Sequence, residues 1–336
     1  MAGERRDGAR GEPVVAADAA AAICWGAAGL LLLAVLAAGC DDGARPGRDS
    51  CGDVRTAVRG IVNGVPAWDS AVVPLSEAQA NAVGYLDLGG ESACTGTLIA
   101  PATVLTAAHC IFLNAPAYVR FATGGDAAHP DGVYDGVSWE MYPGYSLLTA
   151  THDLAIVTLA DDPQRDGVVP IPAYLGPPES LVGLSVQAVG YGMTYDGDTG
   201  NTRRWWTVLR VTDEAPLAFS AAGDGGAATC FGDSGGPMLH HDPVRGVEVR
   251  GVLSMADAEC LGASYYVRPE GEGNRAFVAD RIPADACAAL GVDEAGECTA
   301  DGRARWCDGG TVRERDCALC GQRCGWAGDD PGYYCL

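Results

Sequence analysis

Short apolar runs separated by turn-forming residues recur along the chain from residue 61 onward. They fall at residues 82–88, 97–99, 104–107, 154–159, 184–191, 205–211 and 247–254. Short runs that are rich in β-branched, aliphatic and aromatic residues and bounded by Gly, Pro, Asn and Asp are typical of β-strands. Several such strands at regular intervals predict an all-β domain, built either as barrels or as a sandwich.

The N-terminal segment has the pattern of an export signal. Arg5, Arg6 and Arg10 precede an apolar run over residues 16–38, with Leu30–Leu33 at its centre. A basic start followed by an apolar stretch marks a secretory signal peptide, which here would span residues 1–39. Because the run is nearly long enough to cross a bilayer, a retained transmembrane helix is the alternative.

The apolar run ends in the sequence LAAGC at residues 36–40, followed by two aspartates. This ending resembles the lipobox of bacterial lipoproteins, in which the cysteine is lipidated and becomes the mature N-terminus. The resemblance implies a lipid on Cys40 and a place in the bacterial cell envelope. Ala37 stands where a larger aliphatic residue is usual, so ordinary cleavage nearby, followed by secretion, is the alternative. Residues 40–60 are polar and without periodicity, which indicates a tether or pro-segment.

Composition narrows the class of protein further. The chain has 336 residues, enough for about two domains and a substantial core. Its formal net charge is −22, and all 22 basic residues are arginines. Nucleic-acid binding needs a basic surface, so we expect no nucleic-acid partner. The 14 cysteines indicate an oxidising compartment, in agreement with export.

Composition changes after Gly291, where a Cys-rich segment begins. Its cysteines are Cys298, Cys307, Cys317, Cys320, Cys324 and Cys335. So short a segment cannot bury a sufficient apolar core, so we expect disulfides to hold it together. A zinc site at the CxxC pair, residues 317–320, is the alternative. It is disfavoured because exported proteins form disulfides and no histidine lies nearby. The sequence does not choose among the possible pairings.

Three short motifs carry the residues of a nucleophilic catalyst. Ser234 stands in GDSGGP at residues 232–237, His109 follows TAA at residues 106–108, and Asp153 begins DLAIV at residues 153–157. A serine hydroxyl is a poor nucleophile. It needs a base, a carboxylate that orients the base and donors for the developing oxyanion. On its own, the Gly-rich run is also compatible with an ordinary turn.

Together with IVNG at residues 61–64, CTGTLI from Cys94 and GYG at 190–192, these motifs resemble the chymotrypsin/trypsin family of serine endopeptidases. The resemblance spans residues 61–285, and the chain order His–Asp–Ser is the order of the chymotrypsin-like fold. It implies two six-stranded antiparallel β-barrels, with the site in the cleft between them. Residues 275–290, whose helical pattern is broken by a proline, match the place where the family ends in a helix.

The resemblance assigns a role to each motif residue. Ser234 would attack the scissile carbonyl, His109 would transfer its proton, and Asp153 would orient the imidazole. The N–H groups of Gly232 and Ser234 would form the oxyanion hole. His152 is a rival base, but we expect it to point away, because neighbouring residues on a strand face opposite sides.

The residue before the nucleophile, Asp233, has a separate role by resemblance. In the family this carboxylate pairs with an α-amino group newly freed at the Ile-Val-x-Gly end, here at Ile61. That buried pair orders the oxyanion hole and the specificity pocket. A surface aspartate in a turn is the alternative. Relatives have a basic residue directly before the isoleucine, whereas this chain reads Arg59-Gly60-Ile61, so we expect the final cut after Gly60.

The resemblance also implies two disulfides. Cys94 would pair with Cys110 beside His109, and Cys230 with Cys260 across the walls of the specificity pocket. Of the 14 cysteines, these disulfides use four, Cys24 lies in the signal, Cys40 would be lipidated and six lie in the tail, so two are left. These two, Cys51 and Cys287, either pair with each other or exchange with the tail set.

The specificity pocket is located by alignment with the family. Its floor falls at Ala228 with Thr229 beside it, and its walls at Ser254, Ala256 and Ser264. None of these residues is acidic, so we expect no selection of Arg or Lys. Small side chains stand where many relatives have wall glycines, which predicts a pocket for small to medium apolar side chains. A broader pocket that accepts aromatic side chains is the alternative.

These observations predict an exported serine endopeptidase that acts on proteins or peptides and needs no metal or cofactor. Its protease domain would span residues 61–290 and its Cys-rich module residues 291–336, with membrane contact only through a lipid on Cys40. A catalytically silent homologue that acts as a binding or adhesion module is the alternative. A third hypothesis gives the tail the main role, as a module that binds carbohydrate or another envelope or extracellular component.

Overall fold

The structure, a computed structural model, describes residues 61–90, 93–194, 200–283, 287, 290–308, 310–327 and 332–336. The predictions for residues 1–60, including the signal, the lipid on Cys40 and the tether, lie outside these residues. Within the described part of the chain, no helix is long and apolar enough to span a membrane.

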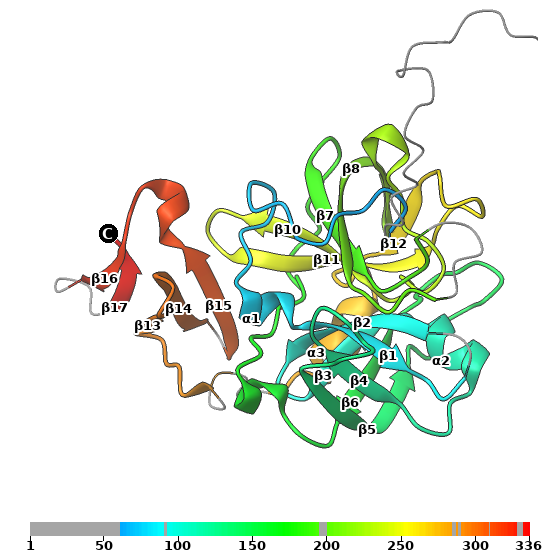
Figure 1. The fold of residues 1–336 in the computed structure, drawn as a ribbon, viewed down its shortest axis with the longest axis horizontal. Coiled ribbons are helices and arrows are strands. Elements are labelled where there is room, and N and C mark those ends of the chain that lie inside the picture. The colour runs from blue at the N-terminus through cyan, green and yellow to red at the C-terminus, as the bar shows by residue number, and fades with distance from the viewer. Residues whose placement is uncertain are drawn as a thin grey trace, which may run out of the picture. The chain divides into compact units, whose positions relative to one another are not determined.

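Twelve of the described strands form two closed antiparallel barrels of six strands each (Figure 1). The first barrel consists of β1 (Val83–Asp87), β2 (Ala93–Ala100), β3 (Thr103–Thr106), β4 (Arg120–Thr123), β5 (Gly132–Met141) and β6 (Ala155–Leu159). The second consists of β7 (Ser185–Gly190), β8 (Trp205–Ala215), β9 (Ala218–Ala222), β10 (Pro237–Asp242), β11 (Gly246–Met255) and β12 (Ser264–Val267). The order around them is β1-β2-β3-β6-β5-β4 and β10-β11-β12-β9-β8-β7. The predicted chymotrypsin-like, all-β fold is confirmed.

Every apolar run singled out in the sequence overlaps one of these strands, with ends that differ by a residue in several cases. The strands that the sequence did not reveal are those whose side chains are largely exposed or whose apolar runs are very short. In the ten-residue β5, for example, Tyr134 is the one buried residue. A strand with so little buried surface has no hydrophobic pattern by which it can be recognised.

Apolar side chains that alternate along the strands fill both barrels. In the first barrel, Leu86, Leu105 and Phe121 are at most 1% exposed, and in the second Leu209 and Phe219 are equally buried. Each fully buried side chain of this size contributes about 1.5–3 kcal/mol of transfer free energy. These two cores hold the strand ends that form the candidate site.

Helices are few and short. They are α1 (Glu77–Ala80), α2 (Ala108–Asn114) and α3 (Asn274–Ala279), with the 3₁₀ turns η1 (Pro163–Asp166), η2 (Asp224–Gly226) and η4 (Cys317–Cys320). The helix expected over residues 275–290 is therefore wrong in length, since α3 ends at Ala279. Pro283 cannot donate a backbone hydrogen bond, and Cys287 is held in a disulfide to the tail.

The tail forms two small antiparallel sheets. The first contains β13 (Glu297–Cys298), β14 (Arg303–Asp308) and β15 (Thr311–Asp316), and the second β16 (Cys324–Ala327) and β17 (Gly332–Cys335). Three disulfides connect this region: Cys287–Cys307, Cys298–Cys324 and Cys317–Cys335. Of the two alternatives for Cys287, exchange with the tail set is thus the one that the structure shows, and a pair with Cys51 is ruled out. Among the described cysteines, Cys320 is an exposed free thiol.

Buried polar contacts attach the tail to the first residues of the body and to the second barrel. Arg303 donates to the carbonyl oxygens of Pro74 and Leu75. Ser76 donates its hydroxyl to Glu314 at 3.0 Å, and a separate ion pair joins tail and barrel through an arginine of β15. Because these contacts are buried, the tail and the barrels support each other.

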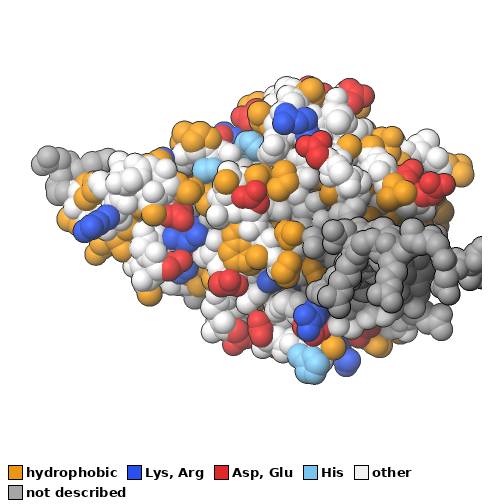
Figure 2. Space-filling model, turned by 45° about the horizontal axis from the view of Figure 1, so that its top comes forward, with side chains coloured by type: hydrophobic (Ala, Val, Ile, Leu, Met, Phe, Trp, Pro, Cys, Tyr) orange, Lys and Arg blue, Asp and Glu red, His pale blue; other side chains and the backbone are white. Residues whose placement is uncertain are grey.

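Arginines pair with carboxylates over much of the molecule. Arg245 and Arg313 both contact Glu248, and Arg250 and Arg268 both contact Glu270. On the face drawn in Figure 2, the basic side chains lie singly among acidic and apolar ones rather than in one patch. That face offers no continuous basic surface.

Candidate active site

His109 lies at the start of helix α2, which follows strand β3. The N-cap residue of this helix, Ala107, has no side-chain hydrogen bond to offer the free N–H groups of the first turn. Asp153, just before β6, fills that role, because its Oδ1 accepts from the backbone N–H of His109 at 2.8 Å. Its Oδ2 accepts from Nδ1–H of the same histidine at 2.7 Å. One carboxylate thus fixes both the helix start and the imidazole, and leaves Nε2 as the basic nitrogen.

The second barrel supplies a further donor to this carboxylate. Ser254, at the end of β11, donates its hydroxyl to Asp153 Oδ2 at 2.6 Å. The carboxylate is 1% exposed, and a buried charge needs donors to replace its lost water. The alignment placed Ser254 in the wall of the specificity pocket. Its hydroxyl contacts Asp153, and its place in the pocket wall stays a prediction.

Ser234 lies in the loop between β9 and β10 and is half-buried. Its carbonyl oxygen accepts from the N–H of Thr95 at 2.8 Å, so the loop is attached to the first barrel. Gly232 has a φ of 94°, in the left-handed region, and a Cβ there would lie 2.8 Å from Gly192 Cα. Only glycine fits this position, which explains one glycine of the motif.

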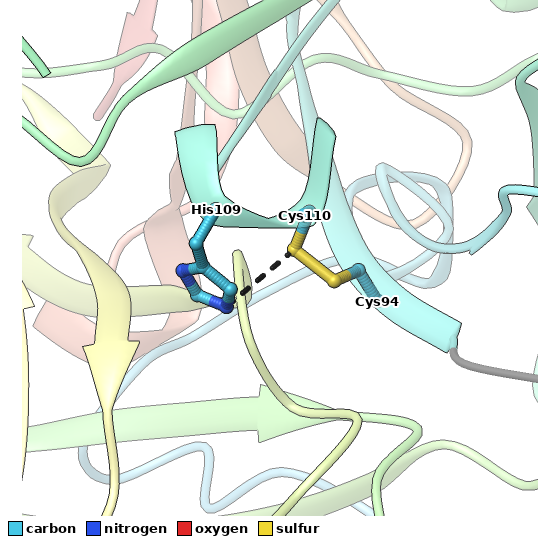
Figure 3. A group of neighbouring side chains, drawn as sticks. All are labelled: Cys94, His109 and Cys110. Carbon is cyan, nitrogen blue, oxygen red and sulfur yellow. Dashed lines mark hydrogen bonds between the residues drawn. A yellow bond between two sulfur atoms is a disulfide. The ribbon is translucent and has the colours of Figure 1, made fainter. Parts of the chain in front are cut away.

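His109 and Ser234 line one cleft of about 370 Å³. Among the hydrogen bonds of the described residues, none joins Ser234 Oγ to His109. The imidazole Nε2 lies 3.9 Å from Cys110 Sγ, the contact drawn in Figure 3. Catalytic hydrogen bonds of this kind are often long before a substrate binds and tighten in the complex. The placement is thus compatible with a nucleophile and its base.

The side chains in Figure 3 also form a compact group of potential metal ligands, Cys94, His109 and Cys110. Cys94 and Cys110 are joined by a disulfide, the pair that the resemblance implies, and Cys230 is likewise joined to Cys260. Metal binding requires the thiolate, which a disulfide sulfur does not carry. This group is therefore a stabilised turn beside the histidine.

Asp233 is completely buried. Its Oδ2 accepts from the N–H of Cys230 and its Oδ1 from the N–H of Gly192, each at 2.8 Å. Burial raises the pKa of this carboxyl to about 7, although the two backbone donors act in the opposite direction. A Cβ at Gly190 would collide with Oδ1, so the GYG motif provides the space that the carboxylate occupies.

Residues 61–64 dock against the loop that carries the pocket floor. Ile61 is 0% exposed, and Val62 pairs with Ala228 as an isolated β-bridge. Asn63 donates its amide to the carbonyl oxygen of Gly226 at 3.1 Å. The segment that would carry a new terminus therefore already contacts the specificity loop.

The predicted floor of the pocket is buried and neutral. Ala228 and Thr229 are each 1% exposed and Ser264 is 0% exposed. The hydroxyls of Thr229 and Ser264 are 2.8 Å apart and satisfy each other. Ala256 is partly exposed at the wall. The structure brings Thr229 and Ser264 into contact, with Ala228 next to Thr229 in the chain. That these residues and Ala256 line one specificity pocket stays a prediction.

His152 does not face the cleft, for a reason other than the one expected. It has a φ of 55° and precedes β6, so the alternation of a strand does not apply to it. Its Nδ1 donates to Asn274 Oδ1 at 2.6 Å, and its ring stacks on Tyr142 with centroids 4.4 Å apart. His152 is thus a packing residue between the first barrel and α3.

Apolar side chains line the cleft beside the catalytic candidates. Tyr85, Leu113, Met193 and Phe231 accompany His109 and Ser234 there. Phe231 and Leu113 are 55% and 62% exposed, so they form a rim that a substrate can contact. These residues carried no motif, and the sequence analysis missed them.

Two hydroxyls that cross between the barrels were also missed. Ser254 reaches a residue 101 positions away, and the hydroxyl of Thr95 reaches a carbonyl 137 positions away. No local pattern can show such a contact. The one available signal was the need of a buried Asp153 for more donors than a histidine supplies.

The comparisons with known proteins agree with this geometry. The family model Trypsin matches residues 73–269. A trypsin of Choristoneura fumiferana is 28% identical over 209 residues, covering 56% of this chain and 78% of that protein. A trypsin of Saccharopolyspora erythraea is 28% identical over 173 residues, covering 47% and 75%. The solved structure of human heparin binding protein has a TM-score of 0.55 at 20% identity, covering 66% of this chain and 96% of that one. The chain belongs to the trypsin family of serine proteases.

Proposed function

We propose that this chain is an exported serine endopeptidase with His109, Asp153 and Ser234 as its catalytic triad. The observation that carries the proposal is the carboxylate of Asp153, which holds the His109 ring at 2.7 Å while Ser234 lines the same cleft. Acyl transfer needs a serine on a tight turn, a histidine beside it, and a buried carboxylate that fixes the tautomer of that histidine.

In the proposed mechanism, His109 Nε2 takes the proton of Ser234 as its Oγ attacks the scissile carbonyl. Asp153 stabilises the imidazolium that forms, and the same histidine then protonates the leaving amine. The N–H groups of Gly232 and Ser234 stabilise the oxyanion. Water repeats the sequence on the acyl-enzyme and releases Ser234. No step requires a metal or a cofactor.

The alternative is a catalytically silent homologue that binds proteins without cleaving them. It is disfavoured, because the named trypsin relatives are proteases and the triad residues are all present. A fluorophosphonate probe tests this directly, since it labels only an activated serine. Labelling of the wild-type protein and its loss in Ser234→Ala would support the proposal. A folded wild-type protein that takes up no probe after removal of residues 1–60 would refute it.

The neutral pocket supports cleavage after small to medium apolar residues. Ala228, Thr229, Ala256 and Ser264 offer no carboxylate, and a buried ammonium or guanidinium without a partner is costly. The hydroxyl pair of Thr229 and Ser264 fills part of the depth that a long side chain would need. A cleavage profile on a peptide library gives the specificity.

We further propose that activation exposes a new terminus at Ile61. The complete burial of Asp233 without a cationic partner among the described residues supports this, because an α-ammonium at Ile61 would neutralise it. N-terminal sequencing of probe-labelled protein should read Ile-Val-Asn-Gly. An equally active form that begins at Gly60, or an uncut active chain, would contradict the proposed route.

Attachment through a lipid on Cys40 remains a proposal from the sequence. A Cys40→Ser variant is expected to leave the membrane fraction while keeping its peptidase activity, because more than one acyl chain is needed for stable anchoring. A mature N-terminal peptide without lipid mass would disprove attachment and leave secretion as the alternative.

The tail is proposed to bind an envelope or extracellular component. Exposed aromatic side chains, Trp326 and Tyr334, lie on its second sheet and suit such contacts. Because buried bonds join the tail to the body, the full-length Ser234→Ala protein is the right probe for a pull-down on envelope material. Trp326→Ala in the same background is the control, and equal retention of both would refute a role for this surface.

A further inference from the structure

The hydroxyl of Thr95 joins two loop segments of the second barrel to the first barrel. Thr95 lies in β2 beside Cys94 and is 0% exposed. Its Oγ1 donates to the carbonyl oxygen of Gly232 at 3.1 Å and accepts from the N–H of Tyr191 at 3.2 Å. One side chain thus satisfies two backbone groups that would otherwise be buried without a partner.

The backbone of Thr95 makes further contacts that do not depend on its side chain. Its N–H donates to the carbonyl oxygen of Ser234 at 2.8 Å, and its own carbonyl oxygen accepts from the hydroxyl of Thr106 at 2.9 Å. Any residue at position 95 would keep these bonds. The part that is specific to Thr95 is therefore the hydroxyl, and its partner in the nucleophile loop is Gly232.

Gly232 is the residue of this loop that most needs such a restraint. It has a φ of 94° and no side chain, so nothing of its own limits the rotation of its peptide groups. Its N–H is one of the two proposed oxyanion donors and lies in the peptide plane shared with Phe231, whose carbonyl oxygen accepts from the N–H of Met193 at 2.7 Å. The carbonyl oxygen that Thr95 holds belongs to the next plane, which joins Gly232 to Asp233 and so lies between the two proposed donors, Gly232 and Ser234. Fixing this plane removes one of the two rotations at Gly232 and restrains the segment that connects the donors.

The second hydrogen bond of the hydroxyl, from the N–H of Tyr191, restrains the segment that packs against Gly232. Tyr191 directly precedes Gly192, whose N–H donates to Asp233 Oδ1 at 2.8 Å. A Cβ on Gly232 would touch Gly192 Cα, so the two glycines are in close backbone contact. Thr95 therefore holds both Gly232 and the segment against which Gly232 packs.

We propose that Thr95 is a positioning residue of the oxyanion hole, acting through the carbonyl oxygen of Gly232. The inference rests on the proposed function, since the geometry of the hole matters only where Ser234 reacts. It predicts that the hydroxyl of Thr95 contributes to turnover and much less to the binding of substrate in its ground state.

Three variants separate this role from ordinary packing. Thr95→Val removes the hydroxyl at nearly constant shape, and Thr95→Ser restores it. Thr97→Val is the matched control, because Thr97 lies two residues along the same strand, is 1% exposed, and its Oγ1 has no hydrogen-bond partner among the described residues. Where Thr95→Val does not fold, Thr95→Ala takes its place with the same expectations.

The first measurement is steady-state kinetics, with kcat calculated per active site counted by fluorophosphonate titration, and KM. The second is the affinity for a peptide boronate, whose adduct with the serine places an oxygen in the oxyanion hole. Thr95→Val should lower kcat about 10- to 100-fold with little change in KM, since loss of a whole oxyanion donor costs about 10²–10³. Affinity for the boronate should fall by a similar factor. Thr95→Ser should stay within about threefold of wild type, and Thr97→Val should be unchanged.

Two results would overturn the inference. One is a kcat per titrated site in Thr95→Val that equals wild type, which would leave the hydroxyl a purely structural role. The other is a loss in Thr95→Ser as large as in Thr95→Val, which would point to the lost methyl group. If the wild-type protein itself is not labelled, the proposed function fails, and that failure is distinct from either of these.

Discussion

In the first barrel, the candidate base and its carboxylate are joined directly, and Asp153 receives two hydrogen bonds from His109 alone. In the second barrel, the nucleophile loop contains a carboxylate, Asp233, that is just as buried but has only backbone donors. The buried carboxylate of the first barrel thus has a side-chain partner. The buried carboxylate of the second has no cationic partner among the described residues, so the proposed activation would act on the second barrel.

The two halves are also linked through hydroxyls that cross the cleft in opposite directions. Ser254 of the second barrel donates to Asp153 of the first, and Thr95 of the first donates to Gly232 of the second. Each barrel therefore supplies hydrogen bonds to the candidate site residues of the other. The proposed site thus depends on the relative placement of both barrels.

The largest effect is expected from removing one catalytic residue in each half. His109→Ala and Ser234→Ala should each lower kcat/KM by about 10⁴-fold or more, and the double variant should be no worse than either one, because triad members act as a unit. The measurement is hydrolysis of a peptide amide, with thermal unfolding as the control for folding. A double variant that loses the product of the two single factors would mean that the halves act independently.

Specificity should respond to changes in the second barrel alone. Substrates with Ala, Val or Leu before the scissile bond should exceed those with Arg or Lys by about 10²-fold or more in kcat/KM, since none of the residues predicted to line the pocket is acidic. Ala256→Gly should raise activity on aromatic residues by opening the wall. Ala228→Asp alone should not produce full Arg specificity, because Ala256 and Ser264 still take up space. A profile dominated by Arg in the wild-type protein would show that the pocket alignment is wrong.

Asp233 offers a test of the unpaired charge by pH. The folded pKa of about 7 is higher than the ordinary value of 3.8, so the folded chain binds the proton more tightly than the unfolded chain. The contribution of Asp233 to stability is therefore fully present below about pH 4 and is lost as pH rises to about 7. The loss between pH 5 and pH 8 is roughly 2–3 kcal/mol in the uncut Ser234→Ala protein.

Urea unfolding at several pH values measures this slope, and Ser234→Ala/Asp233→Asn is the control. The amide does not titrate, so its slope should be flatter by that amount. An unchanged slope would assign the titration to another group. Cleavage that frees Ile61 should also flatten the slope, because a paired carboxylate ionises at lower pH.

Much of this molecule could be predicted from its sequence, and the reasons are local. Buried strands such as β7 and β11 have sequences rich in apolar residues. The motifs around His109 and Ser234 reflect short-range needs such as the left-handed φ of Gly232. Exposed strands such as β5 left no such pattern. The roles of Ser254 and Thr95 were not predictable, because each depends on a partner more than a hundred residues away.

The tail shows the same limit more strongly. Its small sheets are held by disulfides, and cysteine positions do not encode their pairing. The exchange of Cys287 with the tail set depends on where Val169 and Val312 bring the chain together in a small buried cluster. The tail contacts of Arg303 with Pro74 and Leu75 likewise join residues that only the folded chain places side by side.

The smallest effect is expected from Ser254, the residue by which the second barrel completes the first. Ser254→Ala removes one of three donors to Asp153, and the two bonds from His109 remain, so kcat should fall only about 10-fold. In an Asp153→Asn background, the same substitution should cost little, because the charge that the hydroxyl stabilises is gone. Ser264→Ala is the matched control. Ser264 is a buried serine of the same barrel whose hydroxyl contacts Thr229, and its loss should alter specificity rather than kcat.

If Ser254→Ala lowers kcat as much in the Asp153→Asn protein as in the wild type, the hydroxyl of Ser254 acts on substrate rather than on the carboxylate. Ser254 would then belong to the pocket wall where the alignment first placed it.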